Sequence, residues 1–115
     1  MKTAYNHALD ALGRRARSTR ELSRWLADRD HPAEEIEGAV ERLTAGGLLN
    51  DAKFAETFAR SRLVDRKLSK RRVLTELGRK GIPRDIADAA VAAVFEDEGV
   101  DEEAAIEAIA VKKAR

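Results

Sequence analysis

The chain has 115 residues, which is long enough for one domain or for a short array of small units. It contains no cysteine, which excludes disulfides and thiolate metal sites, and charged residues make up 37% of it against 4% aromatic residues. This composition favours an all-helical fold with an aliphatic core. No apolar stretch resembles a signal peptide or a membrane span, so we expect a cytoplasmic protein without membrane contact.

The net charge of +1 conceals four alternating blocks. Residues 1–24 hold six basic and two acidic side chains, and residues 25–50 hold two and six. Residues 51–84 hold eleven basic and four acidic side chains, and residues 85–115 hold three and nine. Such blocks either form a basic ridge for a polyanion or pair with one another as a solvated surface.

Helical spacing and capping signals are clear in the first half of the chain. Apolar residues three and four apart predict a first helix from about Thr3 to Arg15. Ser18 and Glu21 form a capping box that starts a second helix, and Pro32 suits the first turn of a third. Gly46 and Gly47 end that third helix.

The second half of the chain repeats these helix start and stop signals. Asn50 caps a fourth helix over about residues 51–65, and Leu49 and Phe54 fall at the positions of a hydrophobic staple at its start. A fifth helix begins near Ser69, and Pro83 starts a sixth. Gly81 between them is expected in the left-handed conformation, Gly99 ends the sixth helix, and Asp101 caps a seventh.

A shift of 51 residues superimposes the two halves, placing Ser18 on Ser69 and Pro32 on Pro83. A repeat of this length is typical of stacked helical units. We therefore predict tandem three-helix repeats, built from helix-turn-helix-like units, in an elongated array. The predicted units are residues 1–48, residues 49–99 and, for the first helix of an incomplete third unit, residues 100–115.

The strongest functional signal is a cation cluster in residues 60–72, which contain seven basic side chains and a single acidic one, Asp65. Such a cluster is expected to face a polyanion, either phosphates or an acidic protein groove. The predicted contact residues, with one further lysine downstream, are Arg60, Arg62, Arg66, Lys67, Lys70, Arg71, Arg72 and Lys80.

No arrangement of residues predicts catalysis. His7 and His31 are the only histidines and are expected to be surface or capping residues rather than metal ligands. The acidic run at residues 96–98 lacks the spacing of a calcium loop, and no glycine-rich phosphate loop is present. We expect no catalytic residues, no metal, no cofactor and no small-molecule substrate. Trp25, Phe54 and Phe58 are expected in the core.

Several short motifs follow one another along nearly the whole chain. They are Arg14-Arg15 with Arg17-Ser18 and Glu21-Leu22, then Gly47-Leu48-Leu49-Asn50-Asp51 with Phe54-Ala55, and finally Glu76-Leu77 with Lys80-Gly81-Ile82. In this order they resemble the RecX family, which regulates the RecA recombinase. Each motif is weak alone, and their order and spacing together carry the resemblance.

The resemblance implies tandem three-helix repeats, no catalysis, and binding to RecA filaments on single-stranded DNA with restraint of their activity. Weak, non-specific binding of single-stranded nucleic acid would accompany it. The chain departs from the family pattern at two points. Family members usually carry a glycine in the loop that here reads Lys67-Leu68-Ser69. They also usually complete a third unit, of which only the first helix is predicted here. Two alternatives stay open, namely a stand-alone helix-turn-helix DNA-binding module with its recognition helix at residues 69–80, and a helical scaffold that binds no nucleic acid.

Overall fold

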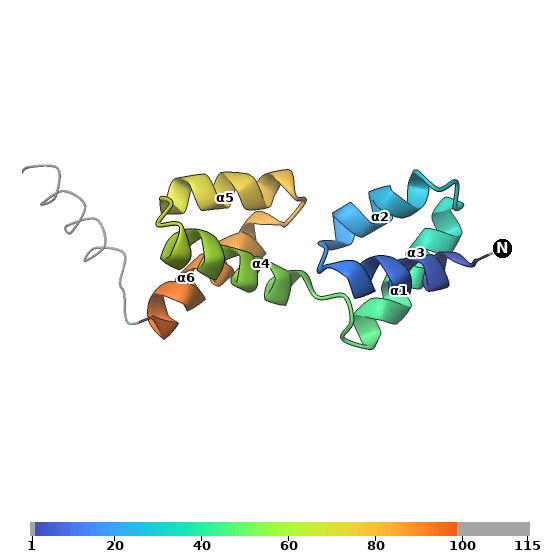
Figure 1. Ribbon diagram of the computed structural model, residues 1–115, viewed down its shortest axis with the longest axis horizontal. Coiled ribbons are helices and arrows are strands. Elements are labelled where there is room, and N and C mark those ends of the chain that lie inside the picture. Colours follow the sequence, from blue (N-terminus) through green and yellow to red (C-terminus); the bar gives the residue numbers. More distant parts are fainter. Residues whose placement is uncertain (1, 99–115) are drawn as a thin grey trace, which may run out of the picture.

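The computed structural model describes residues 2–98, which form six α-helices and one π-helical turn. Two three-helix units lie end to end in an elongated body of 61 × 23 × 23 Å (Figure 1). This confirms the predicted all-α fold of three-helix units. The predicted third unit, with its cap at Asp101, lies outside the described residues.

Local signals set the ends of the helices in the first unit. The Thr3 side chain accepts a hydrogen bond from the backbone N–H of Asn6, and Ser18 and Glu21 form the predicted capping box. Gly47 has a φ of 77° after the last helix, a conformation that glycine adopts without steric cost. The bounds are α1 Ala4–Arg14, α2 Thr19–Ala27 and α3 Ala33–Ala45.

The second unit repeats these signals. Asn50 and Ser69 accept hydrogen bonds from the N–H groups three residues downstream, and Pro83 precedes the last helix. Gly81 has a φ of 84°, as predicted. The bounds are α4 Asp51–Arg60, the π-helical turn η1 Ser61–Asp65, α5 Lys70–Arg79 and α6 Arg84–Asp97.

Each unit buries its own apolar core. Equivalent positions of the repeat are buried in both cores: Leu22 corresponds to Val73 and Leu26 to Leu77. Leu49 belongs to the first core, whereas Phe54 packs against the second. The two residues predicted to form a staple therefore serve different cores, because the chain between them passes from one unit to the next.

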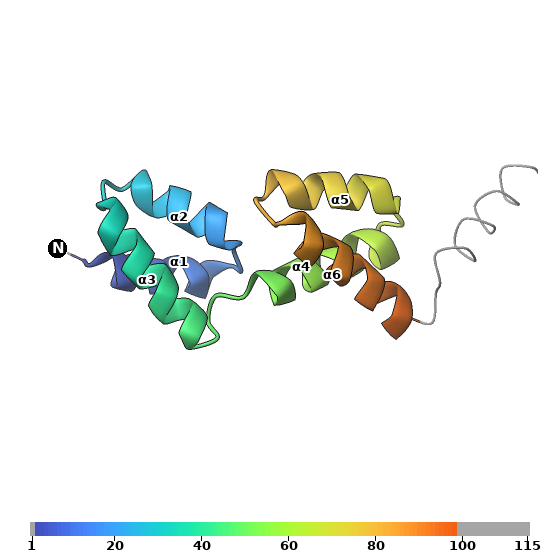
Figure 2. The same cartoon turned by 180° about the vertical axis from the view of Figure 1, so that it is seen from behind.

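The two units meet through polar contacts at the start of α2. The Ser18 hydroxyl, which is fully buried, donates to the carbonyl oxygen of Lys80 over 2.5 Å, and the N–H of Thr19 donates to Oδ1 of Asp51 over 2.7 Å. Seen from either side, α2 and α5 lie end to end along one edge of the body (Figures 1 and 2). We call these two hydrogen bonds the junction hydrogen bonds.

Candidate polyanion-binding surface

The predicted cation cluster begins where the chain leaves α4 through a π-helical turn. The N–H of Arg66 donates to the carbonyl oxygen of Ser61, five residues earlier, over 3.1 Å. The predicted helical span of residues 51–65 is thus correct, but its last five residues are wound more widely than an α-helix. Lys67 follows with a φ of 56°, the left-handed conformation that a glycine would adopt freely at this point of the loop.

Arg60 is held by acidic side chains from two helices. Its guanidinium lies 3.4 Å from Oε1 of Glu56, 2.9 Å from Oδ2 of Asp97 and 3.4 Å from Oε1 of Glu98. Burial alone would lower its pKa, but the hydrogen bond and charge of Glu56, with the charge of Asp97, outweigh this and raise the pKa. Arg60 therefore ties α4 to the end of α6.

Arg62 and Lys80 both lie over the ring of Phe58. The Arg62 Cζ is 4.3 Å and the Lys80 Nζ 5.4 Å from the ring centre, within the range of cation–π attraction. Arg62 Nε is also 3.9 Å from Oε1 of Glu76, and the Lys80 Nζ is 3.6 Å from Oε2 of Glu21. These two predicted contact residues are half-buried and have neighbours of opposite charge.

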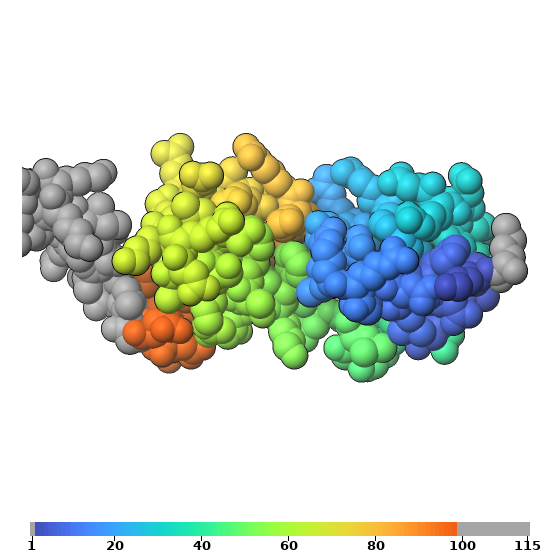
Figure 3. Space-filling model, viewed as in Figure 1, coloured from blue at the N-terminus to red at the C-terminus, as the bar shows by residue number. Residues whose placement is uncertain are grey.

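The other members of the predicted set lie nearer the solvent. Arg66, Lys67 and Arg71 are exposed and form no ion pair with any residue in 2–98. Arg72 keeps a side chain that is 67% exposed although its Nε lies 3.7 Å from Oε2 of Glu76. Lys70, at the first position of α5, is half-buried. The side chains of α5 project beyond the body along its upper edge (Figure 3).

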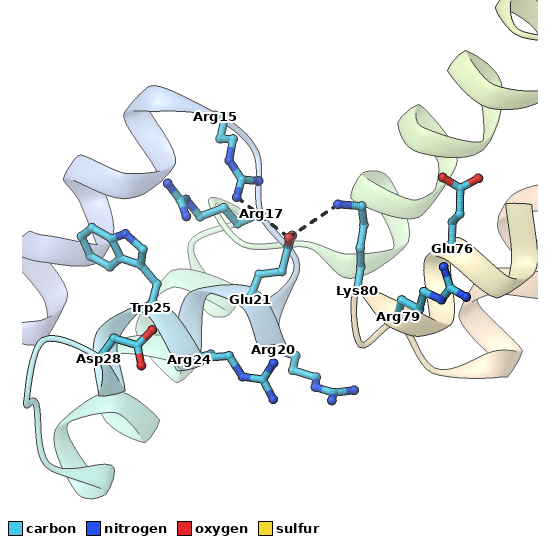
Figure 4. Close-up of a pocket in the computed structure, with 10 residues that line it drawn as sticks. All are labelled: Arg15, Arg17, Arg20, Glu21, Arg24, Trp25, Asp28, Glu76, Arg79 and Lys80. Carbon is cyan, nitrogen blue, oxygen red and sulfur yellow. Dashed lines mark ion pairs between the residues drawn. The ribbon is translucent and has the colours of Figure 1, made fainter.

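The structure also gathers arginines that were not among the predicted contacts. An open cavity of about 540 Å³ lies between α2 and the end of α5 (Figure 4). It is lined by Arg15, Arg17, Arg20, Glu21, Arg24, Trp25, Asp28, Glu76, Arg79 and Lys80. Two signals pointed to it: the excess of basic residues in positions 1–24, and the repeat, which superimposes Arg20 on Arg71.

Glu21 partly neutralises this cavity. Its Oε2 lies 3.9 Å from the Arg15 guanidinium and 3.6 Å from the Lys80 Nζ, so it bridges the two units (Figure 4). Burial lowers the pKa of Arg17, and the nearby charge of Arg15 lowers it further. Arg20, Arg24 and Arg79 are exposed and form no ion pair within residues 2–98, so the cavity keeps a positive potential.

His7 lies between His31 and Trp25 in the first unit, with ring centres 4.9 Å and 6.2 Å away. His7 Nδ1 and His31 Nε2 are 2.6 Å apart, and both rings are half-buried. They were expected as surface or capping residues, but neither is fully exposed and other residues cap the helices of the first unit. Trp25 packs against the first core as predicted, and the Arg29 guanidinium covers its ring at 3.5 Å. Within residues 2–98, no group of three or more histidine or acidic side chains could hold a metal ion.

None of the helices described in residues 2–98 has the length and apolarity needed to cross a membrane.

Comparison with protein families matches both units. The family description for the first three-helix domain of RecX matches residues 4–43, and that for the second three-helix domain of RecX matches residues 50–91. The matched segments coincide with α1–α3 and with the span from α4 into α6.

Named relatives and solved structures agree. The regulatory protein RecX of Mycolicibacterium vanbaalenii is 37% identical over 86 residues, which cover 75% of this chain and 47% of that protein. The regulatory protein RecX of Halorhodospira halophila is 39% identical, covering 82% and 55%. The crystal structure of RecX from Lactobacillus salivarius superimposes with a TM-score of 0.76 at 25% identity, covering 83% of this chain and 61% of that one.

The chain spans about half the length of the curated relatives it matches. Both family domains are present in it, in family order and with the fold of a solved RecX structure. The chain therefore belongs to the RecX family.

Proposed function

We propose that this chain binds RecA filaments assembled on single-stranded DNA in the cytoplasm and restrains their recombinase activity without catalysing a reaction. The observation that carries the proposal is the presence of both RecX three-helix domains, matched over residues 4–43 and 50–91 and joined in one body. Relatives that match these residues are named regulatory proteins.

The shape of the body suits a long partner. Its radius of gyration of 17.1 Å exceeds the roughly 13 Å expected for a compact domain of about 100 residues. An elongated body can contact several repeating subunits of a filament at once. The exposed cations Arg66, Lys67, Arg71 and Arg72 provide the electrostatic attraction to a filament that contains nucleic acid.

The test is ATP turnover by RecA on single-stranded DNA with increasing amounts of the chain. We expect turnover to fall and the chain to sediment with the filaments. The double variant Arg71→Glu/Arg72→Glu should inhibit RecA less than the native chain does. The control is the single charge reversal Lys53→Glu, on an exposed residue of α4 that lines a different cavity, and it should inhibit as the native chain does. Unchanged turnover together with no co-sedimentation would overturn the proposal.

The arrangement of α5 supports a second candidate, a helix-turn-helix DNA-binding module. One exposed side of α5 carries Arg71, Thr75 and Arg79, spaced four residues apart as on a recognition helix. A titration of duplex DNA without RecA separates the two. Tight, sequence-selective binding favours the module, while weak and steeply salt-dependent binding favours the regulator.

A further inference from the structure

The exposed arginines of the two units form one continuous row. A second cavity, of about 460 Å³, is lined by Ser69, Arg71, Arg72, Thr75, Glu76 and Arg79 along α5. It shares Glu76 and Arg79 with the cavity between the units. The helix α2 continues the line of α5 along the same edge (Figure 1). The row therefore passes from Arg71 and Arg79, which line the second cavity, to Arg20 and Arg24, which line the cavity between the units with Arg79 (Figure 4).

The row is long enough for several consecutive charges on a ligand. At about 1.5 Å per residue, Arg71 to Arg79 span roughly 12 Å along α5, and Arg20 to Arg24 span roughly 6 Å along α2. Its cations are spaced along the edge rather than gathered at one point. A ligand with regularly repeated negative charges matches this distribution better than a single anion does.

The chemistry of the row favours phosphates over a protein surface. Protein interfaces are built around apolar and aromatic centres, whereas interfaces with nucleic acid are far more basic. Trp25 is the one aromatic residue that lines either cavity of the row, and Arg29 already covers its ring at 3.5 Å. The Arg29 guanidinium thus competes with a base for this ring, whereas arginine contacts to phosphates need no aromatic platform and carry no sequence information.

The junction hydrogen bonds hold the two halves of the row in register. Ser18 and Thr19, at the start of α2, bind the carbonyl of Lys80 and the carboxylate of Asp51. Arg20, the next residue, lies over Gly81 so closely that a Cβ at position 81 would be 2.3 Å from its Cδ. The base of the Arg20 side chain is thus fixed against the loop that follows Arg79.

We propose that one strand of nucleic acid lies along this row with its phosphates on Arg71, Arg72 and Arg79 of α5 and on Arg20 and Arg24 of α2. The strand thereby bridges the two units. This assignment rests on the proposed function and deepens it, because it names the surface that meets single-stranded DNA and includes the first unit in it.

The test is a salt titration with a labelled oligothymidylate in the absence of RecA. Each phosphate contact to a single strand contributes about −0.7 to the slope of log K against log salt. Arg20→Gln/Arg24→Gln should therefore reduce the magnitude of the slope by about 1.4, as should Arg71→Gln/Arg72→Gln. The control Lys53→Gln should leave the slope unchanged. Glutamine is chosen at position 20 because it keeps the first side-chain carbons, which pack over Gly81.

An unchanged slope in the Arg20→Gln/Arg24→Gln variant, with its circular dichroism spectrum intact, would overturn the row. Binding of poly-glutamate tests the alternative ligand, an acidic protein segment. If the row binds such a segment, the Arg20→Gln/Arg24→Gln variant should lose affinity for poly-glutamate and keep its affinity for the oligonucleotide. Assays of RecA turnover on the same proteins keep the two proposals apart. If the variant has a reduced slope but the native chain does not inhibit RecA, only the proposed function is contradicted. If the native chain inhibits RecA but the slope of the variant is unchanged, only the row is contradicted.

Discussion

Gly81, at the junction of the two units, can be replaced by no larger residue without strain or a steric clash. Gly81 turns the chain beneath Arg20 with a φ of 84°, and a Cβ there would lie 2.5 Å from the Cβ of Arg20. The near part of a side chain cannot move aside as its far end can. Gly78, three residues earlier and inside α5, has nothing within 4 Å of the place where its Cβ would be.

This contrast gives a matched pair of substitutions. Gly81→Ala should lower the free energy of unfolding by at least about 1–2 kcal/mol, the cost of a left-handed alanine, and the contact with Arg20 adds to it. Gly78→Ala should raise it by about 0.5–1 kcal/mol, because alanine is favoured in a helix. Urea denaturation followed by circular dichroism measures both, and a loss for Gly81→Ala of no more than about 1–2 kcal/mol would contradict the close placement of Arg20.

The pair of His7 and His31 makes stability depend on pH. Burial lowers the pKa of His7 below its ordinary value of 6.5, and the charge of His31 and then of Lys2 lowers it further. The unfolded chain therefore binds this proton more readily than the folded chain. The stability that neutral His7 contributes is present above pH 6.5 and is lost as the pH falls below that value.

Thermal unfolding between about pH 7.5 and 5 measures this loss. We expect the midpoint of the native chain to fall over this range by more than that of the His7→Gln variant, which cannot take up the proton. A fall of equal size in the two proteins would assign the pH dependence to other groups.

At the level of the helix, the two units use the same cap for different purposes. Ser18 and Ser69 are equivalent in the repeat, and each accepts a hydrogen bond from the N–H three residues on. Ser69 is exposed, and within residues 2–98 its hydroxyl makes only this hydrogen bond. Ser18 is fully buried and also donates to the carbonyl oxygen of Lys80 in the other unit.

Replacing each serine by alanine separates capping from docking. Ser69→Ala should cost about 1 kcal/mol, the typical value of an N-cap. Ser18→Ala loses the cap and leaves the part-buried carbonyl of Lys80 without its donor, so the loss should be larger, by up to about 1–3 kcal/mol. Urea denaturation of the two variants gives the difference, and a difference near zero would mean that the bond to Lys80 contributes nothing to stability.

Across the whole molecule, stability is divided between two cores that share a polar junction. No extensive helix–helix contact in residues 2–98 crosses from one unit to the other. The units meet through the junction hydrogen bonds, the ion pair of Glu21 with Lys80 and the packing of Arg20 on Gly81. Net stabilisation by a hydrogen bond is only about 0.5–1.5 kcal/mol. We therefore expect the two units to be weakly coupled in folding.

Hydrogen exchange tests this coupling. Leu22→Ala removes a fully buried side chain from the first core and should cost about 2–5 kcal/mol. Amide protection should fall over α1–α3 and change little over α4–α6. Val73→Ala, at the equivalent position of the second core, should give the reverse pattern, and a uniform loss in either variant would show that the units unfold as one.

Local signals were sufficient to predict the helices and the repeat. Caps and turns act within a few residues, so Ser18, Asn50 and Gly81 could be recognised from their neighbours in the chain, and the structure confirms each of them. The wider winding after Arg60 was not predictable in this way, because a π-helical turn has no comparable signal in the sequence.

The sequence by itself determined that this protein is an all-helical array of RecX type with alternating basic and acidic segments. Only the tertiary structure decided which cations face the solvent, because their partners are distant in the chain. Arg60 is occupied by Asp97, 37 residues away, while Arg20 is set beside the end of α5 by a hydrogen bond between residues 62 positions apart. Charge can be counted along a sequence, but ion pairing and surface position depend on contacts between segments that only the fold brings together.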